Sequence, residues 1–167
     1  MSKTPTLAPR AAAFGDALSA TAGAFLVHGG ELEVRTCGRH ELVDLTGRVR
    51  EFVRPLGIRE GLVHVWSLHT TCAVFVSELQ EALGQDIAQL MESLAPRESA
   101  WLHNDPRHSD CDRRNADAHL RTMLLGHSVT VRLGGGELGL GEWQRVLLGE
   151  FDGPRSRTVS LQASGIA

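Results

Sequence analysis

The sequence predicts an α+β fold, in which two main helices and one short helix pack on a largely antiparallel β-sheet. Segments rich in Val, Thr, Trp and Phe, which favour strands, alternate with segments whose apolar residues follow the helical period. Most strands are joined by short connections of the hairpin type, which favour antiparallel pairing. With 167 residues, the chain is long enough to bury one hydrophobic core.

The first element is an N-terminal extension. Residues 1–27 are expected to be loosely held, and residues 28–167 to form a single domain. The extension is rich in Ala, but Pro9, Arg10 and Asp16 interrupt it, so no apolar run reaches the length of a signal core or a membrane span. A transit peptide is the alternative interpretation.

Two short strands and a helix come next. The strands are expected at 31–36 and 40–46, with Gly38 between them. The helix is indicated by apolar residues at i, i+3, i+4 and i+7, which are Val49, Phe52, Val53 and Leu56. Pro55 and Gly57 are expected to end it.

Two further strands, 62–69 and 72–76, are expected to meet at a hinge in the sequence His-Thr-Thr. Ser77 can cap the second main helix, with Gln80 as its capping-box partner. That helix has an apolar face and ends before Pro96; the face consists of Leu83, Ile87, Leu90 and Leu94.

The polar segment 97–116 is expected to be a largely solvated loop, and loops of that length are often functional. A short helix at 117–125 follows and ends at Gly126. The remaining elements are all strands, at 128–133, 138–140, 142–151 and 158–162.

The composition argues against several classes of protein. The net charge is −3 and the chain has no basic cluster, so nucleic acid is not an expected partner. The three cysteines are widely spaced, odd in number and form no Cys-x-x-Cys motif, which favours a reducing compartment. We therefore expect a cytoplasmic protein that binds neither nucleic acid nor membranes.

Three of the eight histidines lie at the edges of predicted elements. His69 ends a strand, His103 lies in the long loop, and His119 lies in the first turn of the short helix. Three neutral imidazoles can hold a transition metal and leave a position open for water or substrate. Their spacing matches no local metal motif, so surface or helix-capping histidines are the alternative.

Charged residues suggest further site candidates. Glu150 and Gln144 share a strand face with apolar residues, and a buried Glu150 would need a partner; a solvated strand end is the alternative. Glu78 lies at a helix start, where the helix dipole alone could explain it. Arg155, after an Asp-Gly-Pro turn, could bind phosphate or lie exposed.

The start of the short helix is unusually polar. Asn115, Asp117 and His119 fall within five residues, although a helix start needs only one capping side chain. The excess of polar groups therefore needs an explanation beyond capping.

Three runs closely resemble the YjbQ family, a group described as secondary thiamine-phosphate synthases. They are HTTCAVFVSE at 69–78, RNADAHL to LLGHS at 114–128, and GEWQ to EFDGPR at 141–155. The likeness covers residues from about 28 to 162. It implies a small α+β protein, a homotrimer, and a polar, histidine-bearing pocket near a subunit interface.

The resemblance also suggests a reason for the polar start of the short helix. Asn115 or Asp117 would cap the helix, His119 and the remaining polar group would face the pocket, and the free N–H groups of the helix start could bind a phosphate.

The resemblance also implies the residues of the site. Substrate would be bound by Thr70, Thr71, Ser128 and Arg155. Catalytic groups would be Glu78, Asn115, His119, Gln144 and Glu150. A divalent metal, Zn, Mg or Mn, would be held by His69, His103 and His119. Family members often have Asn-Glu-Asn where this chain has Ser77-Glu78-Leu79, and Thr where it has Glu142, so contacts made by those side chains are lost here.

The leading hypothesis is an enzyme that joins a pyrimidine diphosphate to a thiazole phosphate, with release of pyrophosphate, to give thiamine phosphate. A metal and the helix start would offset charge on the leaving group. The alternatives are a metal-assisted hydrolase of another small phosphorylated substrate and a trimeric binding module without turnover.

Overall fold

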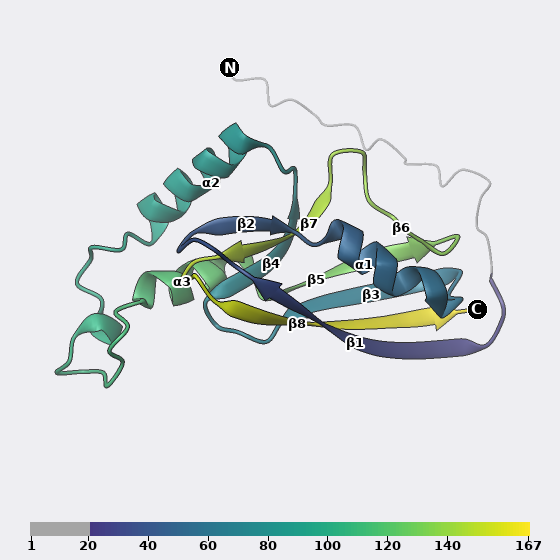
Figure 1. Ribbon diagram of the computed structural model, residues 1–167, viewed down its shortest axis with the longest axis horizontal. Coiled ribbons are helices and arrows are strands. Elements are labelled where there is room, and N and C mark those ends of the chain that lie inside the picture. The colour runs from purple at the N-terminus through teal and green to yellow at the C-terminus, as the bar shows by residue number, and fades with distance from the viewer. Residues whose placement is uncertain (1–20) are drawn as a thin grey trace, which may run out of the picture.

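The computed structural model of the protein describes residues 21–167, and it confirms the α+β fold (Figure 1). The strands are β1 (Phe25–Arg35), β2 (Glu41–Asp44), β3 (Glu60–Ser67), β4 (Cys72–Ser77), β5 (Ser128–Gly134), β6 (Glu137–Leu138), β7 (Arg145–Glu150) and β8 (Ser156–Ile166). The helices are α1 (Thr46–Val53), α2 (Glu81–Leu94) and α3 (Ala116–Leu125), with short 3-10 turns η1 (Arg54–Leu56) and η2 (Leu102–Asn104).

The strands form two sheets rather than the single sheet that was predicted. Sheet A has the order β1-β8-β3-β5-β6, and sheet B has the order β2-β7-β4. All pairs in both sheets are antiparallel, as predicted. The predicted hinge after His69 is where the chain leaves β3 in sheet A and enters β4 in sheet B. One turn in the chain therefore connects the two sheets and places its own residues at their shared end.

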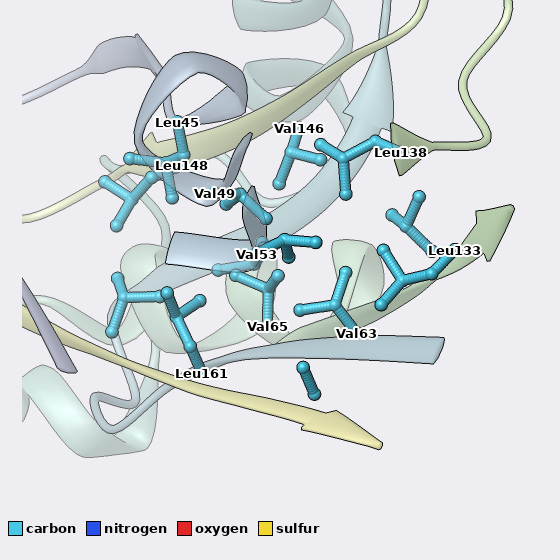
Figure 2. Packing of buried hydrophobic residues seen from close by; sticks show 14 of the residues in the cluster. Leu45, Val49, Val53, Val63, Val65, Leu133, Leu138, Val146, Leu148 and Leu161 are labelled. Carbon is cyan, nitrogen blue, oxygen red and sulfur yellow. The ribbon is translucent and has the colours of Figure 1, made fainter. Parts of the chain in front are cut away.

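The main hydrophobic core lies between the sheets and under α1 (Figure 2). Sheet A contributes residues such as Val63, Val65 and Leu161, whereas sheet B contributes Val146 and Leu148, all almost fully buried. The helical spacing of α1 places Leu45, Val49 and Val53 in the same core. Along β8 buried side chains alternate with more exposed polar ones, as expected for a sheet with one buried face, whereas β7 is buried on both faces.

A smaller apolar cluster lies on the other face of sheet B. It contains Ala73, Met91, Ala118 and Phe151, which come from β4, α2, α3 and the end of β7. Helices α2 and α3 lie at the same end of the molecule, away from α1 (Figure 1). This cluster is the packing that holds the two helices on the sheet.

Helix α2 differs from its prediction in two respects. Its N-cap is Gln80, whose side chain accepts a hydrogen bond from the N–H of Leu83 at 2.8 Å, so the predicted cap at Ser77 is wrong. Leu90 and Leu94, predicted on its buried face, are about half exposed, and Met91 is its buried residue. The helical period identified the apolar residues correctly, but it could not show which of them the sheet covers.

Other boundaries differ less. The strand β1 begins at Phe25, before the predicted domain start at residue 28, and most of the predicted extension lies outside the described residues. The predicted strand 142–151 begins only at Arg145, and the predicted loop contains η2. Gly126 follows α3 with a φ of 90°, which explains the glycine expected there. Among residues 21–167, no helix has the length and apolar character needed to span a membrane.

Candidate functional site

A buried ion pair joins the two sheets at the end where the chain passes between them. Glu150 ends β7 and lies 0% exposed; Arg157 on β8 is 3% exposed. The Arg157 Nε donates to the Glu150 Oε2 at 2.7 Å, and its Nη2 donates both to the other carboxylate oxygen and to the hydroxyl of Thr71. The hydroxyl of Thr36 donates to Oε2 at 3.1 Å. Glu150 therefore lies on the core-facing row with a full set of partners.

The backbone completes this arrangement. The N–H groups of Phe151 and Asp152 both donate to Oε1 of Glu150, at 3.1 and 2.9 Å. A carboxylate held by an arginine, a hydroxyl and two amides is well compensated for its burial. Arg157, through its bonds to Glu150 and Thr71, links the sheets, and the hydrogen bond from the Asp152 N–H to Glu150 holds the backbone of Asp152, two residues on, in place.

Asp152 is the centre of a cluster of arginines. Its Oδ1 accepts from Arg39 at 3.1 Å, whereas its Oδ2 accepts from Arg113 at 3.0 Å and from Arg155 at 3.2 Å. Asn115 donates to the same Oδ2 at 2.9 Å. Asp152 is 2% exposed, but the side chains of Arg39, Arg113 and Arg155 are 24%, 52% and 32% exposed. Three guanidinium groups thus meet one carboxylate and remain open to solvent.

Asp117 continues this network beneath the cluster. Its carboxylate, 0% exposed, accepts from Arg39 at 3.2 Å and lies 3.7 Å from Arg121. Arg121 is also buried, and it donates to the carbonyl of Ala95, to His40 and to the carboxylate of Glu92. The buried carboxylate of Asp117 therefore holds Arg39 and Arg121 in position and is not itself open to a ligand.

The polar start of α3 is explained by these contacts. Asn115 makes no side-chain cap, and the expected role of Asn115 or Asp117 as the cap is wrong. The cap is supplied by Asn104 in η2, whose Oδ1 accepts from the N–H of Ala116 at 3.0 Å. Asn115 and Asp117 instead bind the arginine network, which leaves His119 to face outward from the helix.

His119 and His103 form a pair beside this cluster. Their ring centroids lie 5.0 Å apart in an edge-on arrangement, over a hollow of about 320 Å³ that Trp101 and Leu120 also line. Burial lowers the pKa of His119, and neighbouring His103 adds to the shift, while the charges of Asp152 and Asp117 and a hydrogen bond to the Thr70 backbone oppose it. The imidazole of His119 is therefore kept neutral near neutral pH.

The His103 ring has one nitrogen without a hydrogen-bond partner among residues 21–167. This nitrogen, Nε2, is buried. Buried polar atoms are normally satisfied, so an unpaired ring nitrogen beside a hollow marks a position where a ligand or water can bind. A group bound in this hollow could therefore form a hydrogen bond with the His103 ring.

His69 lies on the other side of the Thr70 backbone. Its Nε2 accepts a hydrogen bond from the N–H of Thr158 at 2.8 Å. Desolvation of the ring, and then the charge of Arg157, lower its pKa. His69 also lines a broad hollow of about 590 Å³ together with Thr70 and Ser128. This hollow and the histidine pair thus share the hinge between β3 and β4 as a common wall.

The predicted three-histidine metal set does not assemble within one chain. The Nε2 of His69 is engaged by the backbone, and His103 pairs with His119 alone. In the part of the chain that the structure describes, no three His, Cys, Asp or Glu side chains are grouped so that they could hold a metal ion. These residues do not fit a metal as a single-chain site.

Glu78 and Gln144 lie elsewhere. Cys72 of β4 pairs with Glu150 of β7, whereas Ser77 pairs with Arg145, so Glu78 and Gln144 are at the opposite end of sheet B from Glu150. Five residues of strand separate these ends by roughly 17 Å. Both side chains are exposed, and the Gln144 Oε1 accepts from the N–H of Gly141 at 2.8 Å in a turn. Within one chain, Glu78 and Gln144 therefore lie away from His103 and His119.

The sequence reasoning missed most of the arginine network. Arg113 was expected in a solvated loop, but it reaches Asp152, 39 positions away. Neither Asp152 nor Arg39 was predicted from the sequence to be a site residue. The signal that could have identified Asp152 is its position in Glu-Phe-Asp-Gly-Pro-Arg, two residues after Glu150, which shares a strand face with apolar residues and would need a partner if buried.

Comparison with known proteins gives one consistent family. The profile described as "UPF0047 protein YjbQ-like" matches residues 30–166. A UPF0047 protein of Methanothermobacter thermautotrophicus is 38% identical over 144 residues, covering 86% of this chain and 96% of that protein. One from Archaeoglobus fulgidus is 43% identical over 133 residues, covering 80% and 98%.

Solved structures agree with the sequences. A crystal structure from Sulfolobus solfataricus, described as a YbjQ-like protein of unknown function, has a TM-score of 0.79 at 31% identity and covers 85% of this chain and 99% of its own. A hypothetical protein of Aeropyrum pernix has a TM-score of 0.76 at 38% identity and covers 83% and 98%. The fold, the matched residues and the relatives together show that this chain belongs to the YjbQ (UPF0047) family.

Proposed function

We propose that the protein is an enzyme acting on a small phosphorylated substrate, whose phosphate is held by the Asp152 arginine cluster beside the His103–His119 pair. The observation that carries this proposal is the excess of positive charge at Asp152. Arg39, Arg113 and Arg155 all contact Asp152 and are partly exposed, and among the described residues Arg39 alone of the three also contacts a second carboxylate, that of Asp117. Guanidinium groups bind phosphate oxygens in a bidentate manner, and Asp152 fixes their positions before substrate arrives.

The reaction that we propose is thiamine-phosphate formation, which the family resemblance suggests. The thiazole nitrogen would attack the methylene carbon of the pyrimidine diphosphate, the carbon–oxygen bond would break, and pyrophosphate would leave with the bonding electrons. Arg113 and Arg155 would offset the charge that develops on pyrophosphate. His119, as a neutral imidazole beside them, would donate to or accept from the substrate and position it.

Several further expectations remain proposals. A homotrimer is supported by exposed apolar side chains on the uncovered strands β1 and β3, among them Val27, Leu62 and Trp66. A second copy could also bring Glu78 and Gln144 to a site that their own chain cannot reach. A divalent metal and a cytoplasmic location stay predictions; the three cysteines are free, as a reducing compartment requires.

The first test separates phosphate binding from turnover. Calorimetric titration with pyrophosphate should show saturable binding to the whole protein. Arg113→Gln should weaken it about tenfold, the equivalent of one charge-assisted hydrogen bond. Arg132→Gln is the matched control, because Arg132 is 71% exposed and paired with Glu60 on the surface. Absence of saturable binding to the wild type would overturn the proposal.

The second test addresses the reaction. The wild type is incubated with the pyrimidine diphosphate and the thiazole phosphate, and product is measured beside His119→Ala. We expect product from the wild type, and its loss in the variant while pyrophosphate binding is retained. Pyrophosphate binding without product would leave a phosphorylated substrate as the proposal and remove thiamine phosphate from it.

A further inference from the structure

A second, separate hollow lies between α2 and sheet B. It has a volume of about 310 Å³, near the lower end of the range for small-molecule sites. Leu42 of β2, Ile87 and Met91 of α2, and Phe151 supply its apolar walls. The groove does not include His103, His119 or any of the three exposed arginines on Asp152. It is therefore distinct from the site proposed above.

One polar group on this groove has a defined hydrogen-bonding state. Nη1 of Arg121 lies 3.0 Å from Nε2 of His40. A guanidinium can only donate, so Nε2 of His40 must be the acceptor, and the proton of the neutral ring must sit on Nδ1. Desolvation of the ring and then the charge of Arg121 lower the pKa of His40, which keeps this neutral form. The His40 ring, which lines the groove, therefore has Nδ1–H as its donor.

The charges around the groove indicate the class of ligand. Each of the three guanidinium nitrogens of Arg121 already donates, to Ala95, His40 or Glu92, so this arginine is not free to bind an anion. Its positive charge is offset by the carboxylates of Glu92 and Asp117. Glu150 on the groove wall is paired with Arg157, and Glu41 accepts from the N–H groups of Cys37 and Gly38. Glu81, in the first turn of α2, is exposed to solvent. Because the other charges are engaged within the protein and the walls are apolar, we infer that the groove suits an uncharged ligand.

We propose that this groove binds an uncharged, heteroaromatic small molecule, whose ring nitrogen or carbonyl accepts a hydrogen bond from Nδ1–H of His40. The rings of His40 and Phe151, with centroids 6.3 Å apart and planes 59° apart, provide aromatic surface for it. The volume suits one or two fused rings and is too small for a helix or a folded segment. The proposal does not depend on the phosphate site.

Gly84 supports the same interpretation. It lies in the first turn of α2, which begins at Glu81, and it lines the groove, although glycine is a weaker helix former than alanine. A Cβ added there would meet only the Leu42 side chain, at an ordinary contact distance of 3.6 Å. The helix can therefore accept a side chain at this position, but a side chain there would occupy part of the groove.

The test uses quinoline as the probe, because it is flat, neutral and has one ring nitrogen that accepts. Methyl NMR signals of Ile87 and Met91 should shift and saturate as quinoline is added to the whole protein. Indole, of similar size but with a ring nitrogen that only donates, should bind roughly 2- to 10-fold more weakly, because it cannot pair with His40.

Two variants locate the binding. Gly84→Leu should fill the groove and weaken quinoline binding at least about tenfold. Gln89→Leu adds the same side chain at an exposed α2 position that does not line the groove, and it should bind as the wild type does. If Gly84→Leu does not fold, Ala88→Leu, at an exposed position on the groove, replaces it. Unsaturable shifts, or equal binding by the groove variant and its control, would overturn the proposal.

Discussion

Replacing Arg157 with Met removes the cation beside Glu150 and keeps a side chain of similar reach. The carboxylate of Glu150 would retain the hydroxyl of Thr36 and the two backbone N–H groups, but it would lose its charge partner while still 0% exposed. Removing one member of a buried ion pair destabilises a protein by about 3–5 kcal/mol, because the other charge stays buried without compensation. We expect a loss of stability in this range.

The double variant separates the charge from the packing. In Glu150→Gln combined with Arg157→Met no charge is left, and the amide oxygen can still accept from the two backbone N–H groups. The expected loss is no more than about 2 kcal/mol, smaller than for the single change. Arg132→Met is the control: it breaks the exposed pair with Glu60 and should change stability by less than about 1 kcal/mol.

The assay is urea unfolding followed by tryptophan fluorescence, at one fixed chain concentration, because the stability of an oligomer depends on concentration. The reasoning would be refuted by an Arg157→Met variant that loses no more stability than the surface control. A double variant as unstable as the single one would refute it equally, since the penalty could not then come from an uncompensated charge.

Three further outcomes are expected. Asn104→Ala should lower the free energy of unfolding by about 0.5–2 kcal/mol in the same urea assay, because the N–H of Ala116 loses its cap. Gly61→Ala should reduce the melting temperature, because its Cβ would lie 2.2 Å from a carbonyl oxygen of β8 and would require a shift costing about 1–3 kcal/mol. Gly29→Ala, in the same sheet with its nearest such contact at 3.9 Å, should melt close to the wild type. The free energy of unfolding should be highest above about pH 6.5 and should fall as the pH is lowered from there, because the three histidines with lowered pKa values take up protons first in the unfolded chain. Urea midpoints that do not change between pH 7.5 and 5.5 would contradict this.

The sequence predicts the elements of this fold well, because each depends on a local pattern. The helical spacing of Val49 and Val53 and the glycine after α3 are properties of neighbouring residues, and the structure confirms both. The division into two sheets and the exposure of Leu90 and Leu94 depend on which surfaces meet, which no local period records. The same limit explains why the cap of α2 was misplaced by three residues.

The candidate site shows this limit more strongly. His103 and His119 were identified as site residues from their places at the edges of elements, and the structure brings them together. Asn115 was identified from an excess of polar groups, but its partner, Asp152, is 37 positions away. The arginines converge because three separate segments, around residues 39, 113 and 155, meet at the end of β7. Convergence of distant segments is a property of the three-dimensional fold, and no pattern among neighbouring residues of the sequence indicates it.

The position of β8 has a consequence for how the chain is made. This strand lies inside sheet A, between β1 and β3, and it pairs with both along much of its length. During translation β1 and β3 are complete long before residues 156–166 leave the ribosome, and neither can pair with the other in its absence. The β1 side of sheet A therefore has to form late, across a large sequence separation that slows folding, whereas β3 can pair with β5 before β8 is made. Until then β1 presents an unpaired edge, which makes the nascent chain a natural client for chaperones.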